Sequence, residues 1–216
     1  MRTSITPNAV TFGWLVLLLG AAFCFACGSY ELRLLGGLLI LVGYALDCVD
    51  GELARLRGLT SKIGSTLEQM VHWVTNCAIV FGVAFGLYRT SADPKYLLLG
   101  LVALVGDTTF HFMYVSLHVA ASPGGQLGLF GLLTRLQFLL MPIQTNLFLV
   151  GAPFNRLDLS LWVWAVWSNL GWIVGFLLFF RVEVREEEAR KMLRGLIEDA
   201  LRQHHMEAEP VNSSRE

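Results

Sequence analysis

The sequence predicts an all-α, polytopic membrane protein with about six transmembrane helices, followed by a C-terminal amphipathic cytoplasmic helix. Hydrophobic residues make up 55% of the 216 residues and charged residues only 15%, against roughly 25% charged residues in a typical soluble domain. The charges are also unevenly placed, because 7 basic and 9 acidic residues follow Phe180. The body of the chain is therefore apolar and its tail is polar.

Six apolar runs are long enough to cross a bilayer, which requires about 20 mostly apolar residues. Glycine, proline and serine are concentrated between these runs, where turns belong. The expected spans are Val10–Ala26, Leu32–Asp50, Ile63–Tyr88, Tyr96–Ala121, Leu129–Val150 and Leu161–Phe180.

The basic residues suggest an orientation. Six spans place both termini on one side, and basic residues before the tail divide five against four between the two sides. The tail adds Arg181, Arg185, Arg190, Lys191 and Arg194 to the terminal side, so the positive-inside rule places both termini in the cytoplasm. We therefore expect a multi-pass protein of the inner (plasma) membrane, with a transmembrane domain over residues 1–181 and a cytoplasmic segment over residues 182–216.

The cytoplasmic segment has a helical pattern. Its apolar residues, among them Leu193, Leu196 and Ile197, recur three and four residues apart, which predicts an amphipathic helix that packs on a surface or in a dimer. A disordered end is expected after Met206. The chain's formal net charge of −1 provides no basic field for a nucleic-acid backbone, so nucleic-acid binding is excluded.

Ionisable side chains gather at the cytoplasmic ends of the second and third spans. Asp47 and Asp50 are three residues apart and share one helix face, while Glu68 and His72 are four residues apart on the next helix. If these faces meet, three carboxylates and one imidazole converge on one cavity. Carboxylates that repel one another in a membrane are stabilised by one or two divalent cations. The neighbouring basic residues Arg55, Arg57 and Lys62, taken without the acidic ones, are typical of side chains that anchor a helix at the lipid headgroups.

The residues then follow a known pattern. Asp47-x2-Asp50-Gly51-x2-Ala54-Arg55-x8-Gly64-x3-Glu68-x3-His72 resembles the signature of the class I CDP-alcohol phosphotransferases, also called CDP-alcohol phosphatidyltransferases. The spacing is kept throughout, and six of the eight signature residues are present. The two departures are Glu68 and His72, which stand where the family has Asp. A Thr6-Pro7-Asn8 start is also similar to that of many members.

The resemblance implies a reaction and a site. An acceptor hydroxyl attacks the β-phosphoryl group of a CDP-alcohol, such as CDP-diacylglycerol, and CMP leaves. The implied ligands of a divalent metal, Mg²⁺ or Mn²⁺, are Asp47, Asp50, Glu68 and His72. The implied nucleotide-binding residues are Gly51, Ala54, Arg55 and Gly64. A homodimer is implied by analogy with the family alone.

His72 has three interpretations. As a general base it suits neutral pH, because an unperturbed imidazole titrates near 6.5. As a metal ligand it favours Mn²⁺ or Zn²⁺ over Mg²⁺, because imidazole is a softer donor than carboxylate. As a lesion it removes the second metal site and with it the transferase activity.

Polar residues of the fourth span form a second candidate group. Asp107, His111, Tyr114 and His118 step along one helix face. An acceptor pocket that includes Tyr114, His118 and Arg135 is one interpretation, and an interhelical hydrogen-bond stripe or a headgroup anchor is the other. The tryptophans, including Trp14, are interpreted as interface or packing aromatics without chemistry.

The leading hypothesis is a metal-dependent membrane transferase of phospholipid biosynthesis, whose partners are a CDP-alcohol donor, a hydroxyl acceptor and membrane lipids. One alternative keeps the fold with a different donor or acceptor. Another is a catalytically impaired pseudoenzyme that binds nucleotide or lipid. A transporter is disfavoured, because the ionisable residues cluster at one face of the membrane and trace no path across it.

Overall fold

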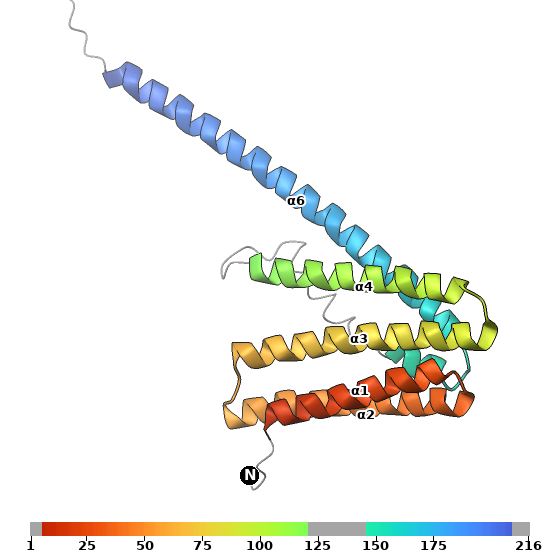
Figure 1. The fold of residues 1–216 in the computed structure, drawn as a ribbon. Coiled ribbons are helices and arrows are strands. Elements are labelled where there is room, and N and C mark those ends of the chain that lie inside the picture. Colours follow the sequence, from red (N-terminus) through yellow and green to blue (C-terminus); the bar gives the residue numbers. More distant parts are fainter. Residues whose placement is uncertain (1–5, 121–145, 209–216) are drawn as a thin grey trace, which may run out of the picture. The chain divides into compact units, whose positions relative to one another are not determined.

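The described part of the protein is built of α-helices alone. In this computed structural model, residues 6–120 and 146–208 are described. The helices are α1 (Pro7–Cys27), α2 (Tyr30–Arg57), α3 (Lys62–Ser91), α4 (Lys95–Ala120) and α6 (Leu157–Ala208), as Figure 1 shows. The prediction of an all-α protein is confirmed.

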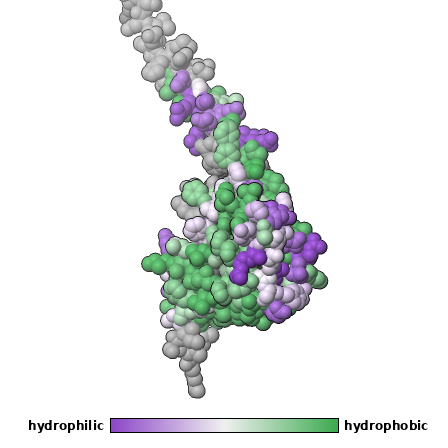
Figure 2. All heavy atoms as spheres, turned by 45° about the vertical axis from the view of Figure 1, so that its right-hand side comes forward, coloured by the Kyte–Doolittle hydropathy of each residue, from purple (hydrophilic) through white to green (hydrophobic). Residues whose placement is uncertain are grey.

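Within the described residues, five helical segments are long and apolar enough to cross a membrane. They are Pro7–Cys27, Tyr30–Arg57, Lys62–Ser91, Lys95–Met113 and Leu157–Leu177. Many large apolar side chains on them are exposed, and Figure 2 shows hydrophobic residues over much of the surface. A soluble protein would bury such a surface, whereas lipid tails cover it in a bilayer. The fifth predicted span, Leu129–Val150, lies largely outside the described residues, so the count of six stays a prediction.

The chain divides into two compact units. Unit 1 comprises Met1–Ile173, and unit 2 comprises Val174–Glu216. Within unit 2 the helix α6 continues to Ala208 and exposes apolar side chains such as Leu193 and Leu196 among charged ones. Unit 1 contains all of the signature residues.

Short capped turns connect the first three helices. Thr6 is the N-cap of α1, where Pro7 occupies a position that needs no N–H donor, and Ser61 is the N-cap of α3. The helix α2 ends at Gly58, which has a φ of 63°, a left-handed conformation that glycine adopts without a steric penalty. Since only three residues separate Gly58 from Lys62, both halves of the signature are held at the same end of the helical hairpin.

The helix α1 packs against both α2 and α3, and α3 also packs against α4. Two glycines allow α1 and α3 to approach closely. A Cβ atom at Gly82 would overlap the backbone oxygen of Ala22, and one at Gly86 would overlap that of Phe25. Glycines four residues apart are a recurrent device for close helix packing in membranes. This contact fixes α1 beside the first turns of α3 that carry the site.

The opposite end of unit 1 is joined by a buried arginine. Arg33 is only 8% exposed, and its guanidinium donates to Asn155 Oδ1 at 2.6 Å and to Thr90 Oγ1 at 3.3 Å. These bonds tie α2 to the end of α3 and to the turn before α6. Polar side chains thus fix the helices at the end away from the signature.

We expect Gly82→Ala to destabilise unit 1 by about 1–3 kcal/mol, the usual cost of overpacking a tight contact. Gly13→Ala is the matched control, because nothing lies within 4 Å of a Cβ atom at Gly13. That control should be neutral or stabilise the helix by up to about 1 kcal/mol. The free energy of unfolding in detergent, followed by tryptophan fluorescence, measures both. Equal effects of the two substitutions would contradict the close contact.

Candidate active site

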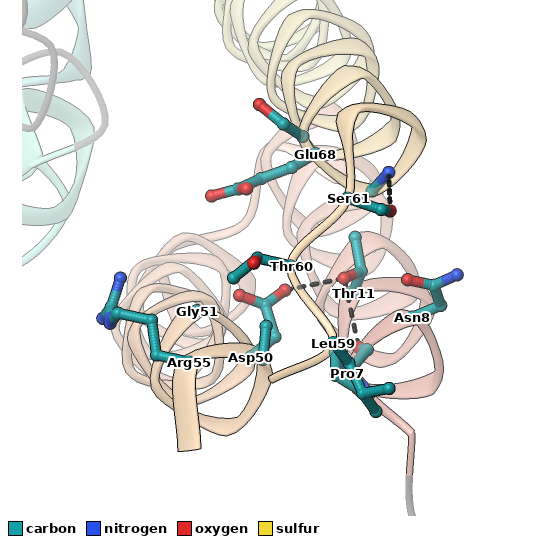
Figure 3. Close-up of a pocket in the computed structure, with 13 residues that line it drawn as sticks. Pro7, Asn8, Thr11, Asp50, Gly51, Arg55, Leu59, Thr60, Ser61 and Glu68 are labelled. Atoms are coloured by element: carbon teal, nitrogen blue, oxygen red, sulfur yellow. Dashed lines mark hydrogen bonds between the residues drawn. The ribbon is translucent and has the colours of Figure 1, made fainter. Parts of the chain in front are cut away.

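Asp50 is a buried carboxylate held by α1. It is 4% exposed, and its Oδ2 accepts hydrogen bonds from Thr11 Oγ1 at 2.7 Å and from Trp14 Nε1 at 2.8 Å. Figure 3 shows the Asp50 side chain directed from α2 toward Thr11 on α1. The other oxygen, Oδ1, is also buried and has no hydrogen-bond partner among the described residues. A buried carboxylate oxygen without a donor is costly, so Oδ1 is suited to a cation.

Asp47, Glu68 and His72 form a second group beside Asp50. One ligand atom from each lies within 4.8 Å of the others, and all three side chains are partly buried. His72 Nε2 lies 3.1 Å from Asp47 Oδ1. The two helix faces that the spacing predicted to meet therefore do meet in the structure.

The charges of this group require compensation. The carboxylate of Glu68 interacts with those of Asp50 and Asp47 as well as with His72. Like charges at such short range are unfavourable in a partly buried site, and a divalent cation relieves them. Asp47, Glu68 and His72 bring together two carboxylates and one imidazole, donors that fit Mn²⁺ and, through the carboxylates, Mg²⁺. Asp50 lies outside that group of three and adds a buried oxygen without a donor among the described residues. Zn²⁺ also fits if the imidazole is a ligand.

A pocket of about 170 Å³ opens beside the group. It is formed by the start of α1, the end of α2, the turn between α2 and α3, and the first turns of α3 (Figure 3). Glu68 lies in both the pocket lining and the metal-ligating group, so the two adjoin. The lining residues are Pro7, Asn8, Thr11, Asp50, Gly51, Ala54, Arg55, Leu59, Thr60, Ser61, Gly64, Ser65 and Glu68.

All four residues expected to bind nucleotide line this pocket: Gly51, Ala54, Arg55 and Gly64. Arg55 forms an ion pair of 2.8 Å with Glu52, and both side chains are more than 60% exposed. An exposed pair of this kind contributes little to stability, so Glu52 does not prevent the guanidinium from binding another anion. The backbone N–H of Gly64 donates to Ser61 Oγ at 3.0 Å, which completes the cap of α3.

The polar residues of the fourth span and Arg135 are less fully described. Asp107 is 3% exposed, and the ring of His111 stacks on that of Trp73 with centroids 6.4 Å apart. The side chains of Tyr114 and His118 are not among the described ones, and Arg135 lies outside the described residues. The acceptor assignment therefore stays a prediction.

The sequence reasoning missed the part that α1 plays. Trp14 packs in the core with none of its surface exposed, in line with a packing role, but its indole N–H also donates to Asp50. The packing role expected for Trp14 is confirmed, and the hydrogen bond to Asp50 is a contact that the prediction from sequence did not include. A signal was present, since Asn8, Thr11 and Trp14 are side-chain donors spaced three residues apart on one face of an otherwise apolar helix.

Comparison with known proteins identifies the family of the chain. The family model described as CDP-alcohol phosphatidyltransferase matches residues 4–179. The chain belongs to this family. The match covers all four spans from α1 to α4 and the start of α6, and it confirms the resemblance that the signature indicated. It does not test the departures at Glu68 and His72.

Two curated relatives match shorter segments. An archaetidylinositol phosphate synthase of Pyrococcus horikoshii is 38% identical over 87 residues, which are 38% of this chain and 42% of the relative. An uncharacterized protein of Aquifex aeolicus is 30% identical over 107 residues, which are 49% of this chain and 52% of the relative. The chain thus spans about half the length of the curated relatives it matches.

Solved structures share the fold. The phosphatidylinositol phosphate synthase of Mycobacterium tuberculosis with CDP-DAG bound superposes with a TM-score of 0.65 at 20% identity, covering 81% of this chain and 86% of that one. The same synthase in complex with manganese and citrate gives a TM-score of 0.64 at 19% identity, covering 81% and 82%. At such low identity the likeness establishes a common fold only.

We expect Asp47→Asn to weaken Mn²⁺ binding at least about tenfold, because it removes a charged oxygen from the group of Asp47, Glu68 and His72. Glu31→Gln is the matched control, since Glu31 is an exposed carboxylate at the other end of the same helix. Titration of the detergent-solubilised protein with Mn²⁺, with free ion followed by electron paramagnetic resonance, measures both. Equal affinities of the two variants would argue against a metal site at Asp47.

Proposed function

We propose that the protein is an integral membrane transferase of phospholipid biosynthesis. It transfers a phosphoalcohol group from a CDP-alcohol to a hydroxyl acceptor and releases CMP. The preferred donor is CDP-diacylglycerol, from which the transferred group is phosphatidyl. One observation carries this proposal. Glu68 belongs both to the pocket that Arg55 lines and to the group of metal-ligating side chains, so the pocket and the group adjoin. Membership of the family supports it.

The pocket is assigned to the nucleotide end of the donor. Gly51 and Gly64 present backbone without side-chain bulk, and Ala54 adds only a methyl group. Arg55 supplies a planar guanidinium that grips a phosphate by two parallel hydrogen bonds. These features suit a cytidine diphosphate entering from the end of the helical hairpin, with Arg55 at the diphosphate.

The metal is assigned to the carboxylates of Asp47, Asp50 and Glu68, and His72 is a fourth ligand in the alternative to its role as general base. Asp50 contributes its buried Oδ1, which has no donor among the described residues. A bound Mg²⁺ or Mn²⁺ supplies neutralisation of the charge that develops on the leaving CMP. The imidazole of His72 favours Mn²⁺, and admits Zn²⁺, where a fourth carboxylate would favour Mg²⁺.

His72 is assigned to the acceptor. The acceptor oxygen forms a bond to the β-phosphorus, the bond from that phosphorus to the CMP oxygen breaks, and the hydroxyl proton passes to the imidazole. Asp47 Oδ1 lies 3.1 Å from His72 Nε2, so the carboxylate would stabilise the positive charge of the imidazole once it accepts the proton. Tyr114, His118 and Arg135 are proposed to bind the acceptor.

The cellular setting follows from the same proposal. Both termini and the active site are assigned to the cytoplasmic side of the inner (plasma) membrane, because the tail concentrates basic residues there. Residues 1–181 form the catalytic domain in this proposal, and residues 182–216 form a cytoplasmic extension. A homodimer is proposed by analogy with the family.

The proposal predicts metal-dependent release of CMP when the purified protein receives a CDP-alcohol and a hydroxyl acceptor. Mass spectrometry of the lipids formed from a panel of donors and acceptors identifies the product. Asp50→Ala should reduce turnover at least about a hundredfold, the scale of losing one charge-stabilising group, while Glu31→Gln should keep it. Binding of CDP without turnover by the unaltered protein would instead favour a pseudoenzyme.

The role of His72 predicts a separate pattern. His72→Ala should lower kcat by about 10²-fold or more, the usual contribution of a general base, and His72→Asp should keep more activity because it restores the family's residue. A metal ligand behaves differently, since excess Mn²⁺ would then restore the kcat of His72→Ala. If both variants keep full turnover with every accepted CDP-alcohol, His72 has neither role.

A further inference from the structure

Trp14 lies where the first three helices meet. It belongs to α1, and none of its surface is exposed. Its indole N–H donates to Asp50 on α2 at 2.8 Å, and its ring lies 4.8 Å from that of His72 on α3 at an interplanar angle of 40°. One side chain therefore touches a residue from each half of the signature. It is not part of the pocket lining.

The hydrogen bond restricts the orientation of the Asp50 carboxylate. A carboxylate rotates broadly about its last torsion unless its oxygens are held. Both donors from α1 reach the same oxygen, Oδ2. Oδ1 is then directed elsewhere, and it is the oxygen without a partner among the described residues. The two oxygens therefore differ, because Oδ2 faces the donors of α1 and Oδ1 is left without a donor among the described residues.

The two donors are not equivalent. The hydroxyl of Thr11 has one hydrogen and two acceptors in range, Asp50 Oδ2 at 2.7 Å and the backbone oxygen of Pro7 at 3.2 Å. It can also rotate, since hydroxyl hydrogens turn to suit their surroundings. The indole of Trp14 has one N–H in a fixed plane, and Asp50 is its acceptor. Trp14 is therefore the more rigid of the two restraints.

We propose that Trp14 is a positioning residue for the metal site, holding Asp50 Oδ2 through its indole N–H so that Oδ1 is presented to the cation. This inference rests on the proposed function, because it requires the metal assigned to Asp50 and its neighbours. Groups that orient a metal ligand without touching the metal usually contribute 10- to 100-fold to affinity or activity. The ring packs against His72 in addition, so α1 restrains both halves of the ligand set.

The test compares Trp14→Phe with Trp164→Phe in the full-length protein. Trp14→Phe removes the N–H donor and retains an aromatic ring beside His72. Trp164 is also buried, at 2% exposed, and its Nε1 has no hydrogen-bond partner among the described residues, so Trp164→Phe matches the loss of bulk without the loss of a bond. The probe is Mn²⁺ alone, with free ion measured by electron paramagnetic resonance.

We expect Trp14→Phe to raise the Kd for Mn²⁺ by about 10- to 100-fold and Trp164→Phe to leave it within about twofold. At saturating Mn²⁺ the kcat of Trp14→Phe should return to within a few-fold of the unaltered protein. In an Asp50→Ala background, Trp14→Phe should cause no further loss of affinity, because the carboxylate it holds is absent.

Three results would overturn the inference: an unchanged Kd in Trp14→Phe, an equal change in Trp164→Phe, or an additive loss in the Asp50→Ala background. Each of these leaves the proposed transferase intact if the unaltered protein binds Mn²⁺ and releases CMP. Failure of the unaltered protein to bind Mn²⁺ would overturn the metal site and the role of Trp14 together.

Discussion

The buried carboxylate of Asp50 is the constraint on which the site depends. It lies among apolar helices, where an ionised group without partners costs several kcal/mol. Its partners come from α1, as Thr11 and Trp14, and α1 is held against α3 by the glycine contact at Gly82 and Gly86. Packing far from the site therefore determines whether the donors reach Asp50. The same arrangement leaves one of its oxygens for a cation.

The hairpin of α2 and α3 supplies the remaining geometry. Gly58 ends one helix in a left-handed conformation and Ser61 begins the next with a side-chain cap. A turn this short brings Asp47 on α2 and His72 on α3 to a 3.1 Å contact. A longer connection would let the two halves of the signature slide along one another, and the helix periodicity alone would not keep them in register.

Of the two departures from the family signature, only His72 changes the charge of the site. Glu68 keeps a carboxylate and extends it by one methylene group, and its oxygen still lies within 4.8 Å of ligand atoms from Asp47 and His72. His72 replaces a fourth carboxylate, so the repulsion between the acidic groups is smaller before any cation binds. An imidazole beside Asp47 also introduces a group that exchanges protons near neutral pH.

The amino-acid sequence was enough to predict the first four spans, the pairing of the signature halves and the pocket side of α2. The apolar composition indicates that lipid surrounds the helices. The helical period places Asp50, Gly51 and Ala54 near one face of their helix, whichever helix packs against it. The part played by α1 emerged from the tertiary packing instead. The bonds from Thr11 and Trp14 to Asp50 span 39 and 36 residues, and a periodic pattern shows which face of a helix is polar but not which side chain it meets. For the same reason Trp14 resembled an ordinary packing aromatic in the sequence, and its indole N–H acquired a role only when α1 was packed against both α2 and α3.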